Sequence, residues 1–149
     1  MRTEKKSKVF SSYKLILYRR YILNIILNQR AIWVGRALSL LIVLQFCFSA
    51  FMKFSQNPKV FEGMVHLGIP NSLVLTIGIL ELLCTVLYAI PATSVLGAIL
   101  LTGYLGGAIC SHLRVGDAVY LQSILGVVIW FALFLRDKRL RDLIPLRKY

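Results

Sequence analysis

Glu81 is the residue whose position in this sequence points most directly to chemistry. It lies within Leu73–Ile90, an 18-residue apolar run that holds no other charged residue. A carboxylate near the centre of a bilayer costs roughly 2.5–3.5 kcal/mol on membrane-insertion scales. Such a residue is expected to face the interior of a helix bundle, to find a partner on a neighbouring helix and to serve a function such as proton exchange.

Further polar side chains recur at helical spacing in the neighbouring apolar runs. One run carries Gln45, Ser49 and Lys53 at intervals of four residues, and another carries Tyr104 and His112, which are eight residues apart. Residues spaced in this way share one face of a helix. We expect these faces to form a polar track that rises from Glu81 to a basic mouth at the outer membrane surface. The predicted track, which is also the candidate ligand site, consists of Gln45, Ser49, Lys53, Glu81, Tyr104, His112 and Arg114.

Each of these residues also has a purely structural interpretation, which the sequence leaves open. Glu81 can act as a clamp that hydrogen-bonds Gln45 or Tyr104 and fixes the register of the helices. Lys53 can extend its ammonium group to the outer interface, as lysines at helix ends commonly do. His112 can cap the end of its helix.

The cysteines and histidines argue against two classes of site. Cys47, Cys84 and Cys110 all fall within apolar segments, and none forms a C-x-x-C pair. A disulfide-exchange enzyme needs a paired, accessible dithiol. His66 and His112 do not have the spacing of metal ligands. We therefore expect neither a catalytic dithiol nor a metal site.

Composition and hydrophobic segments predict an all-α, polytopic membrane protein. Hydrophobic residues make up 58% of the 149 positions and charged residues 16%. In average soluble domains about 45–50% of the residues are apolar and about 25% are charged. The connection Lys53–Ser72 is the longest between apolar segments and has room for a short helix. The predicted four-helix transmembrane bundle consists of segments close to the length that crosses a bilayer, at Ile32–Met52, Leu73–Ile90, Val95–Leu113 and Ala118–Leu135.

Small residues mark one surface of the third predicted helix. Gly103, Gly107 and Ser111 recur every four residues. Small side chains at this spacing let transmembrane helices approach closely. We expect Gly103 and Gly107 to pack against a neighbouring helix and to bring Tyr104 near Glu81.

Basic residues are concentrated at the two ends of the chain. Of 18 Lys and Arg residues, nine lie within residues 1–36 and six after residue 135, and the net charge is +12. The positive-inside rule then predicts that both termini are cytoplasmic, in a bacterial-type inner (plasma) membrane. Anionic membrane lipids, and not nucleic acid, are the expected partners of these residues. The predicted organisation is a basic amphipathic extension at residues 1–30, a four-helix domain at 31–136 and a basic cytoplasmic tail at 137–149.

The chain carries an ordered set of short motifs at Ser49–Lys53, Leu67–Pro70, Gly78–Leu83, Pro91, Gly97 and Gly107–Arg114. This set resembles the DoxX-like family of small four-helix membrane proteins. The chain departs from the family pattern in two places. Ala50 stands where a glycine is usual, and the basic segment Met1–Gln29 lies outside the pattern. The family name derives from a subunit of a quinol-oxidase and thiosulfate:quinone oxidoreductase system, so the resemblance implies a redox association with a possible quinone ligand.

Three functional hypotheses follow. The first is a quinone-linked or redox-stress-associated membrane subunit, in which Glu81 exchanges protons and a redox partner protein supplies the catalytic centre. The second is a non-enzymatic protein that binds a lipid or another small molecule, with Lys53 and Arg114 attracting anionic groups at the mouth. The third is a membrane scaffold in which Glu81 is only a clamp. A homo-oligomer is compatible with each of them.

Overall fold

The computed structural model describes residues 29–143, and every regular element within that range is a helix. The predicted amphipathic extension at residues 1–30 falls almost wholly outside this range, as does part of the predicted tail. The helices that the structure describes are, in chain order, Gln29–Phe54, α2 (Pro58–His66), α3 (Asn71–Ala89), α4 (Ser94–Arg114), α5 (Tyr120–Arg136) and α6 (Lys138–Leu143).

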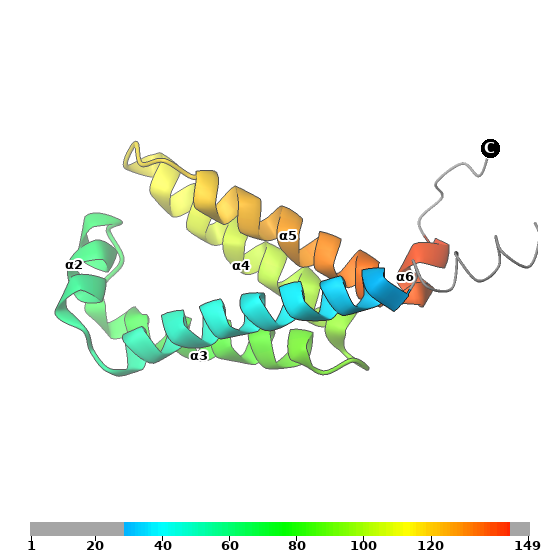
Figure 1. The fold of residues 1–149 in the computed structure, drawn as a ribbon. Coiled ribbons are helices and arrows are strands. Elements are labelled where there is room, and N and C mark those ends of the chain that lie inside the picture. The colour runs from blue at the N-terminus through cyan, green and yellow to red at the C-terminus, as the bar shows by residue number, and fades with distance from the viewer. Residues whose placement is uncertain (1–28, 144–149) are drawn as a thin grey trace, which may run out of the picture.

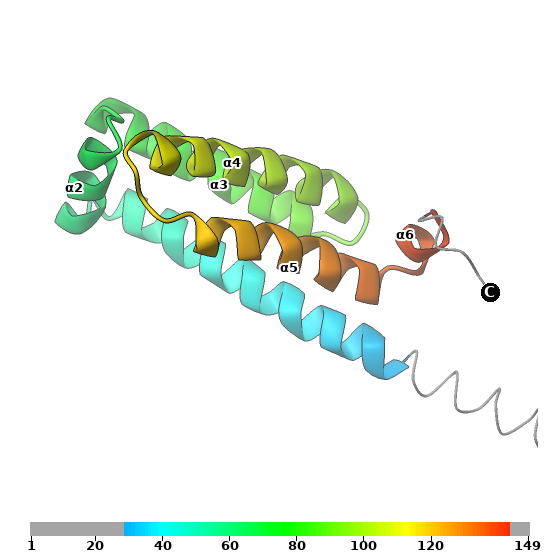
Figure 2. The ribbon, with the colours of Figure 1, turned by 90° about the horizontal axis from the view of Figure 1, so that it is seen from above.

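The long helices lie alongside one another in a bundle, with the two short helices at opposite ends (Figures 1 and 2). α4 packs against both α3 and α5. The Gln29–Phe54 helix meets α3 near Gly78 and α5 near Ala132. We call the two ends of the bundle the α2 end and the α6 end, after the short helix at each.

Turn residues explain where the shorter connections begin and end. Asn57 caps α2 by accepting a hydrogen bond from the Lys59 N–H at 3.0 Å, and Pro58 occupies the first helical position. Gly68 ends the turn after α2 with a φ of 69°, and Gly116 follows α4 with a φ of 82°. Both angles lie in the left-handed region, which favours glycine.

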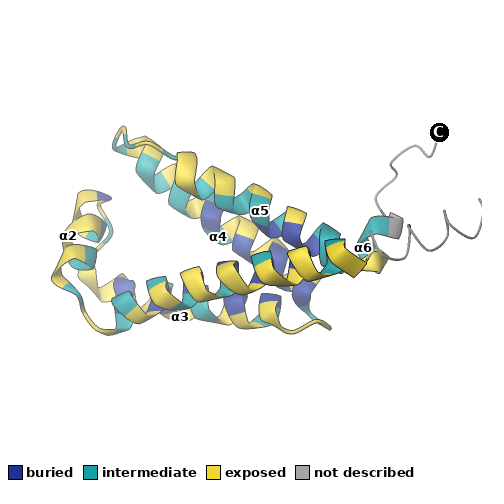
Figure 3. Ribbon diagram, viewed as in Figure 1, coloured by how far each residue is buried: buried dark blue, intermediate teal, exposed yellow. Residues whose placement is uncertain are grey.

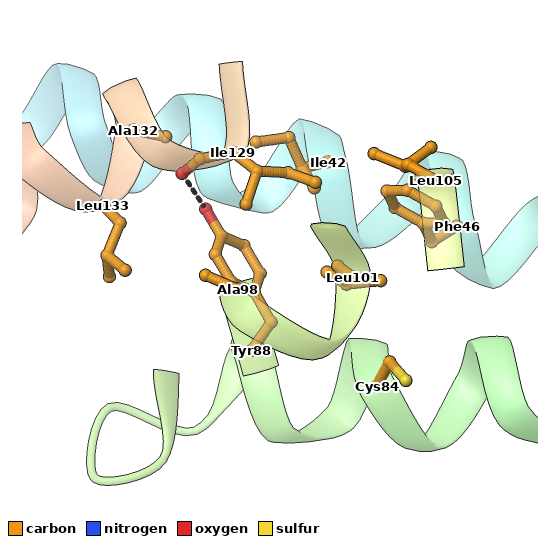
Figure 4. Packing of buried hydrophobic residues seen from close by; sticks show 10 residues of the cluster. All are labelled: Ile42, Phe46, Cys84, Tyr88, Ala98, Leu101, Leu105, Ile129, Ala132 and Leu133. Carbon is orange, nitrogen blue, oxygen red and sulfur yellow. Dashed lines mark hydrogen bonds between the residues drawn. The ribbon is translucent and has the colours of Figure 1, made fainter. Parts of the chain in front are cut away.

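The core lies toward the α6 end, where Tyr88 crosses from α3 to α5. Its hydroxyl group donates a hydrogen bond of 3.2 Å to the Ile129 carbonyl oxygen (Figure 4). Leu101 and Leu133 pack around the ring and are fully buried. Gly97 permits the close approach of α4 to α3, because a Cβ atom there would lie 2.1 Å from the Tyr88 nitrogen.

The outer surface of the bundle is largely apolar. Large hydrophobic side chains on every long helix are exposed, among them Leu44, Leu83, Ile99 and Phe131 (Figure 3). Three helices, Gln29–Phe54, α3 and α4, are long and apolar enough to cross a membrane, and α5 is a shorter apolar helix. Apolar side chains that face outward around buried charges are typical of an integral membrane protein.

Candidate functional site

Glu81 forms a buried ion pair with Lys53. The Lys53 ammonium nitrogen lies 2.8 Å from Glu81 Oε2, and the two residues are 6% and 2% exposed. The ammonium group also donates a hydrogen bond of 2.8 Å to the Ser49 hydroxyl oxygen one turn earlier. The structure thus brings Ser49, Lys53 and Glu81 of the predicted track together, and we call Lys53 and Glu81 the buried pair.

The direction of the Lys53 side chain follows from helix geometry. Long side chains on a helix lean toward its N-terminus, which for Lys53 is toward the middle of the bundle. Gly78, one turn before Glu81, leaves room for the lysine chain, since a Cβ atom there would lie 3.2 Å from Lys53 Cβ. Lys53 therefore turns inward, and the alternative in which it extends to the outer interface does not apply.

α3 and α4 complete the surroundings of the Glu81 side chain. The Thr85 hydroxyl donates a hydrogen bond of 2.7 Å to the Glu81 carbonyl oxygen. From α4, Tyr104 lies close enough to Glu81 for the two side chains to influence each other electrostatically. Edge contact with Phe46, at a centroid distance of 6.3 Å, positions the Tyr104 ring. Glu81 on α3 is therefore surrounded by side chains from the first helix, from its own helix and from α4.

Gln45 differs from its predicted position in the polar track. It is exposed on the bundle surface, whereas Ser49 and Lys53 face inward. A step of four residues exceeds one helical turn by about 40°, so two such steps rotate Gln45 by about 80° from Lys53. Rows of three polar residues at this spacing share a face only loosely, and Gln45 is not the partner of Glu81.

His112 takes part in a separate cluster at the α2 end, which we call the α2-end cluster. His112 Nδ1 lies 3.1 Å from Asp117 Oδ2, and His66 Nε2 lies 3.3 Å from the same carboxylate. Hydrogen bonds from His66 and then His112 lower the pKa of Asp117 below its ordinary value. Asp117 was not among the predicted site residues, although its place in the turn just after the helix of His112 was a signal.

Arg114 also belongs to the α2 end. Its guanidinium group donates a hydrogen bond to the Leu67 carbonyl oxygen, and it lies against Gly68, where a Cβ atom would approach it to 3.0 Å. Arg114 thus ties α4 to the turn after α2. The predicted continuous track is therefore two groups, the buried pair with Tyr104 and the α2-end cluster with Arg114.

Gly103 and Gly107 do not pack against another part of the described chain. Both are exposed, and a Cβ atom at either would meet nothing within 4 Å. α4 buries its Gly97, Ala98, Leu101 and Leu105 face, which turns the glycine face outward. The predicted packing role within the bundle is therefore corrected, and the close approaches occur at Gly78 and Gly97 and at Gly35 of the first helix.

A groove of about 500 Å³ lies between α4 and α5. Gly106 and Gly126 line it, and the indole N–H of Trp130 donates a hydrogen bond of 2.9 Å to the Thr102 hydroxyl oxygen beside it. The Gln122 side-chain oxygen is buried in the groove wall and has no hydrogen-bond partner within the described chain. The sequence carried no sign of this groove, since its residues converge from two helices.

No group of three or more His, Cys, Asp or Glu residues among residues 29–143 is arranged to hold a metal ion. The cysteines there are free: Cys84 is buried one turn from Glu81, whereas Cys110 is exposed. The three cysteines therefore form no disulfide with one another.

Comparison with known proteins places the chain in a family but gives it no named relative. No curated protein and no solved structure matches it. Residues 37–135, about two thirds of the chain, match the DoxX-like family. This range includes the buried pair, the α2-end cluster and the groove, and it confirms the resemblance drawn from the short motifs. The chain is a member of the DoxX-like family.

Proposed function

We propose that the chain is a membrane subunit of a quinone-linked redox system, in which Glu81 exchanges protons and a partner protein carries the electrons. The observation that carries this proposal is the Lys53–Glu81 ion pair, buried in a bundle whose outer surface is apolar. Ionisable residues inside transmembrane bundles commonly mark proton and substrate pathways.

Stability alone is a weak reason to bury such a pair. Replacing a buried ion pair by apolar residues of similar volume is often neutral or stabilising. Transfer of a proton from the Lys53 ammonium group to the Glu81 carboxylate across the 2.8 Å between them would convert the two charges into two neutral groups. A proton can therefore move between Lys53 and Glu81 without leaving a lone charge in a medium of low dielectric constant.

The groove between α4 and α5 is the place where we expect a quinone to bind. Its volume of about 500 Å³ falls within the range of small-molecule sites, roughly 300–1,000 Å³. Its walls are mainly apolar, and Gln122 offers an amide group to a quinone oxygen. Leu105 lines the groove and the adjacent Tyr104 interacts with Glu81, so α4 carries residues of both sites.

The proposal includes the placement of the protein in the membrane. α5 has 17 residues, about 26 Å at 1.5 Å per residue, which crosses a hydrocarbon core of roughly 30 Å with little mismatch. We propose that all four long helices span a bacterial-type inner membrane. The α6 end is then cytoplasmic, because most Lys and Arg residues fall within residues 1–36 or after residue 135, and both of these stretches adjoin the α6 end in the sequence.

The first test asks whether a quinone binds in the groove. The full chain is purified in mild detergent and its bound quinone is extracted and quantified. We expect the wild type to retain quinone and Gly126→Leu, which fills the groove, to lose it. Gly107→Leu is the matched control, because Gly107 is exposed on the same bundle and does not line the groove. A wild type that neither retains nor takes up quinone would contradict the proposal.

The second test asks whether Glu81 exchanges protons. Infrared difference spectra are recorded while the bound quinone is reduced electrochemically. We expect a carboxyl band that is present in wild type, lost in Glu81→Gln and kept in Glu62→Gln. Glu62 is exposed on α2, so its replacement is the same chemical change away from the site. An unchanged spectrum in Glu81→Gln would assign the buried pair a structural role.

A second candidate function is the binding of a lipid without redox chemistry. The groove favours it as well, because its apolar walls suit an acyl chain as well as an isoprenoid. In that case a phospholipid, and no quinone, is recovered with the wild type and lost in Gly126→Leu.

A further inference from the structure

A second cavity, of about 460 Å³, opens at the α6 end of the bundle. Its wall is made from parts of the chain far apart in sequence: the start of the first helix, the turn before α4, and the junction of α5 with α6. Three of its lining residues are arginines, Arg36, Arg136 and Arg139, and one is acidic, Asp137. The cavity therefore concentrates positive charge where the chain turns between helices.

Contacts hold Arg136 in place without neutralising it. Its guanidinium group donates a hydrogen bond of 2.8 Å to the Tyr88 carbonyl oxygen and lies 4.7 Å from the centroid of the Tyr88 ring. None of the three arginines forms an ion pair with a carboxylate of the described chain. Asp137 accepts a hydrogen bond of 2.8 Å from the Arg139 backbone N–H, and so caps α6.

The start of α4 contributes a further preference for an anion. Ser94, its first residue, lines the cavity. Thr93 forms no capping hydrogen bond, because its hydroxyl group donates to the Leu87 carbonyl oxygen instead, and the first turn holds no acidic residue. A helix start with uncapped N–H groups favours a nearby negative charge.

We propose that the α6-end cavity binds a phosphate group, carried by an anionic phospholipid or by a soluble phosphate compound. Arginine guanidinium groups are suited to phosphate oxygens because they donate paired, charge-assisted hydrogen bonds. The Arg36 guanidinium lies 5.3 Å from the Trp33 ring centroid, and tryptophan is enriched at the level of lipid headgroups. Basic pockets between transmembrane helices bind such headgroups. This site is independent of the proposed quinone function.

Two double variants separate the cavity from the general basicity of this end. Arg36→Gln with Arg139→Gln removes two cavity arginines. Arg30→Gln with Lys138→Gln removes the same charge from the same two helices, at positions that do not line the cavity. All four side chains are exposed, so neither pair of changes disturbs the core. Arg136 is kept because it supports Tyr88.

The measurement is native mass spectrometry of the full chain, delipidated in detergent and titrated with phosphatidylglycerol or phosphatidylcholine. We expect wild type to prefer phosphatidylglycerol. The cavity variant should lose about tenfold more affinity for it than the control variant does, since only the cavity arginines are placed to donate charge-assisted hydrogen bonds to a phosphate group in the cavity.

Inorganic phosphate, added as a competitor, identifies the source of the phosphate group. If it displaces phosphatidylglycerol from wild type at millimolar concentration, the cavity recognises phosphate itself and accepts soluble compounds. If it does not, the site is specific for the lipid. Equal losses in the two double variants, or no preference over phosphatidylcholine, would overturn the proposal, because the binding would then reflect only surface charge.

Discussion

The buried pair and the α2-end cluster are two solutions to the placement of charge in one small bundle. Lys53 and Glu81 are 6% and 2% exposed, whereas His66 and Asp117 are 59% and 35% exposed. The separations differ by only a few tenths of an ångström, so geometry does not distinguish the two groups. Exposure does, because water and salt screen the outer group and cannot reach the inner one.

The difference in exposure determines what each group can do. Breaking a buried pair leaves an uncompensated charge, so its members depend on each other. Breaking an exposed pair leaves charges that water solvates at little cost. The buried pair is therefore suited to a coupled protonation change, and the α2-end cluster to holding α2 and the loop before α5 near the end of α4.

The largest expected effect comes from removing one member of the buried pair. Lys53→Met should destabilise the protein by about 3–5 kcal/mol, because Glu81 then keeps a buried, unpaired charge or must take up a proton. Lys53→Met combined with Glu81→Leu should recover most of this loss, since an apolar pair has no such cost. Unfolding in detergent followed by circular dichroism measures both.

Lys59→Met is the control for this comparison, because Lys59 is exposed on α2. It should change stability by no more than about 0.5 kcal/mol. If Lys53→Met were as mild as Lys59→Met, the buried pair would have to be solvated, and its contrast with the α2-end cluster would disappear.

A smaller effect is expected where the helices approach beside the pair. Gly78→Leu should cost about 1–3 kcal/mol, because the added side chain overpacks a site where Phe54 Cε1 already lies 3.1 Å from the position of a Cβ atom. Gly103→Leu, where a Cβ atom meets nothing within 4 Å, should leave stability unchanged or raise it. The same unfolding assay compares the two variants, and equal stabilities would show that Lys53 moves aside freely.

Hydrophobic runs allowed the helices to be predicted well, because their apolar length is a local property of the sequence. The predicted segment Leu73–Ile90 corresponds to α3 at Asn71–Ala89, and the short helix expected in the longest connection is α2. Glu81 was predicted to have a partner on a neighbouring helix, since a charge in an apolar helix needs one, but Lys53 was expected at the outer mouth of the track and not as that partner.

The remaining features depend on how each helix is rotated, which periodicity alone does not determine. Gln45 has the same spacing as Ser49, yet its side chain is exposed on the surface of the bundle. The face of α4 that carries Gly103 and Gly107 also turns outward. Asp117 and the groove beside Gln122 form only when separate helices meet. Sequence patterns thus located the polar residues, while tertiary packing decided which of them share a site.

The smallest effect is expected at the α2-end cluster, and its pH dependence sharpens the contrast most clearly. Asp117→Asn should destabilise the protein less than either change above, because the cluster is exposed. The pKa of Asp117 is lowered in the folded state by His66 and His112. Its stabilising contribution is therefore complete above the ordinary aspartate pKa of about 3.9 and is lost as the pH falls through the lower, folded-state value.

The stability difference between wild type and Asp117→Asn should accordingly narrow as the pH is lowered from 5 toward 3. It should also shrink in 1 M salt, where the Debye length falls to about 3 Å. The cost of Lys53→Met should resist the same salt, because ions do not enter the bundle. Salt titration of both variants in the unfolding assay gives the comparison directly: equal sensitivity would mean that Lys53 and Glu81 are as accessible to solvent as Asp117, and neither could then hold a proton apart from water.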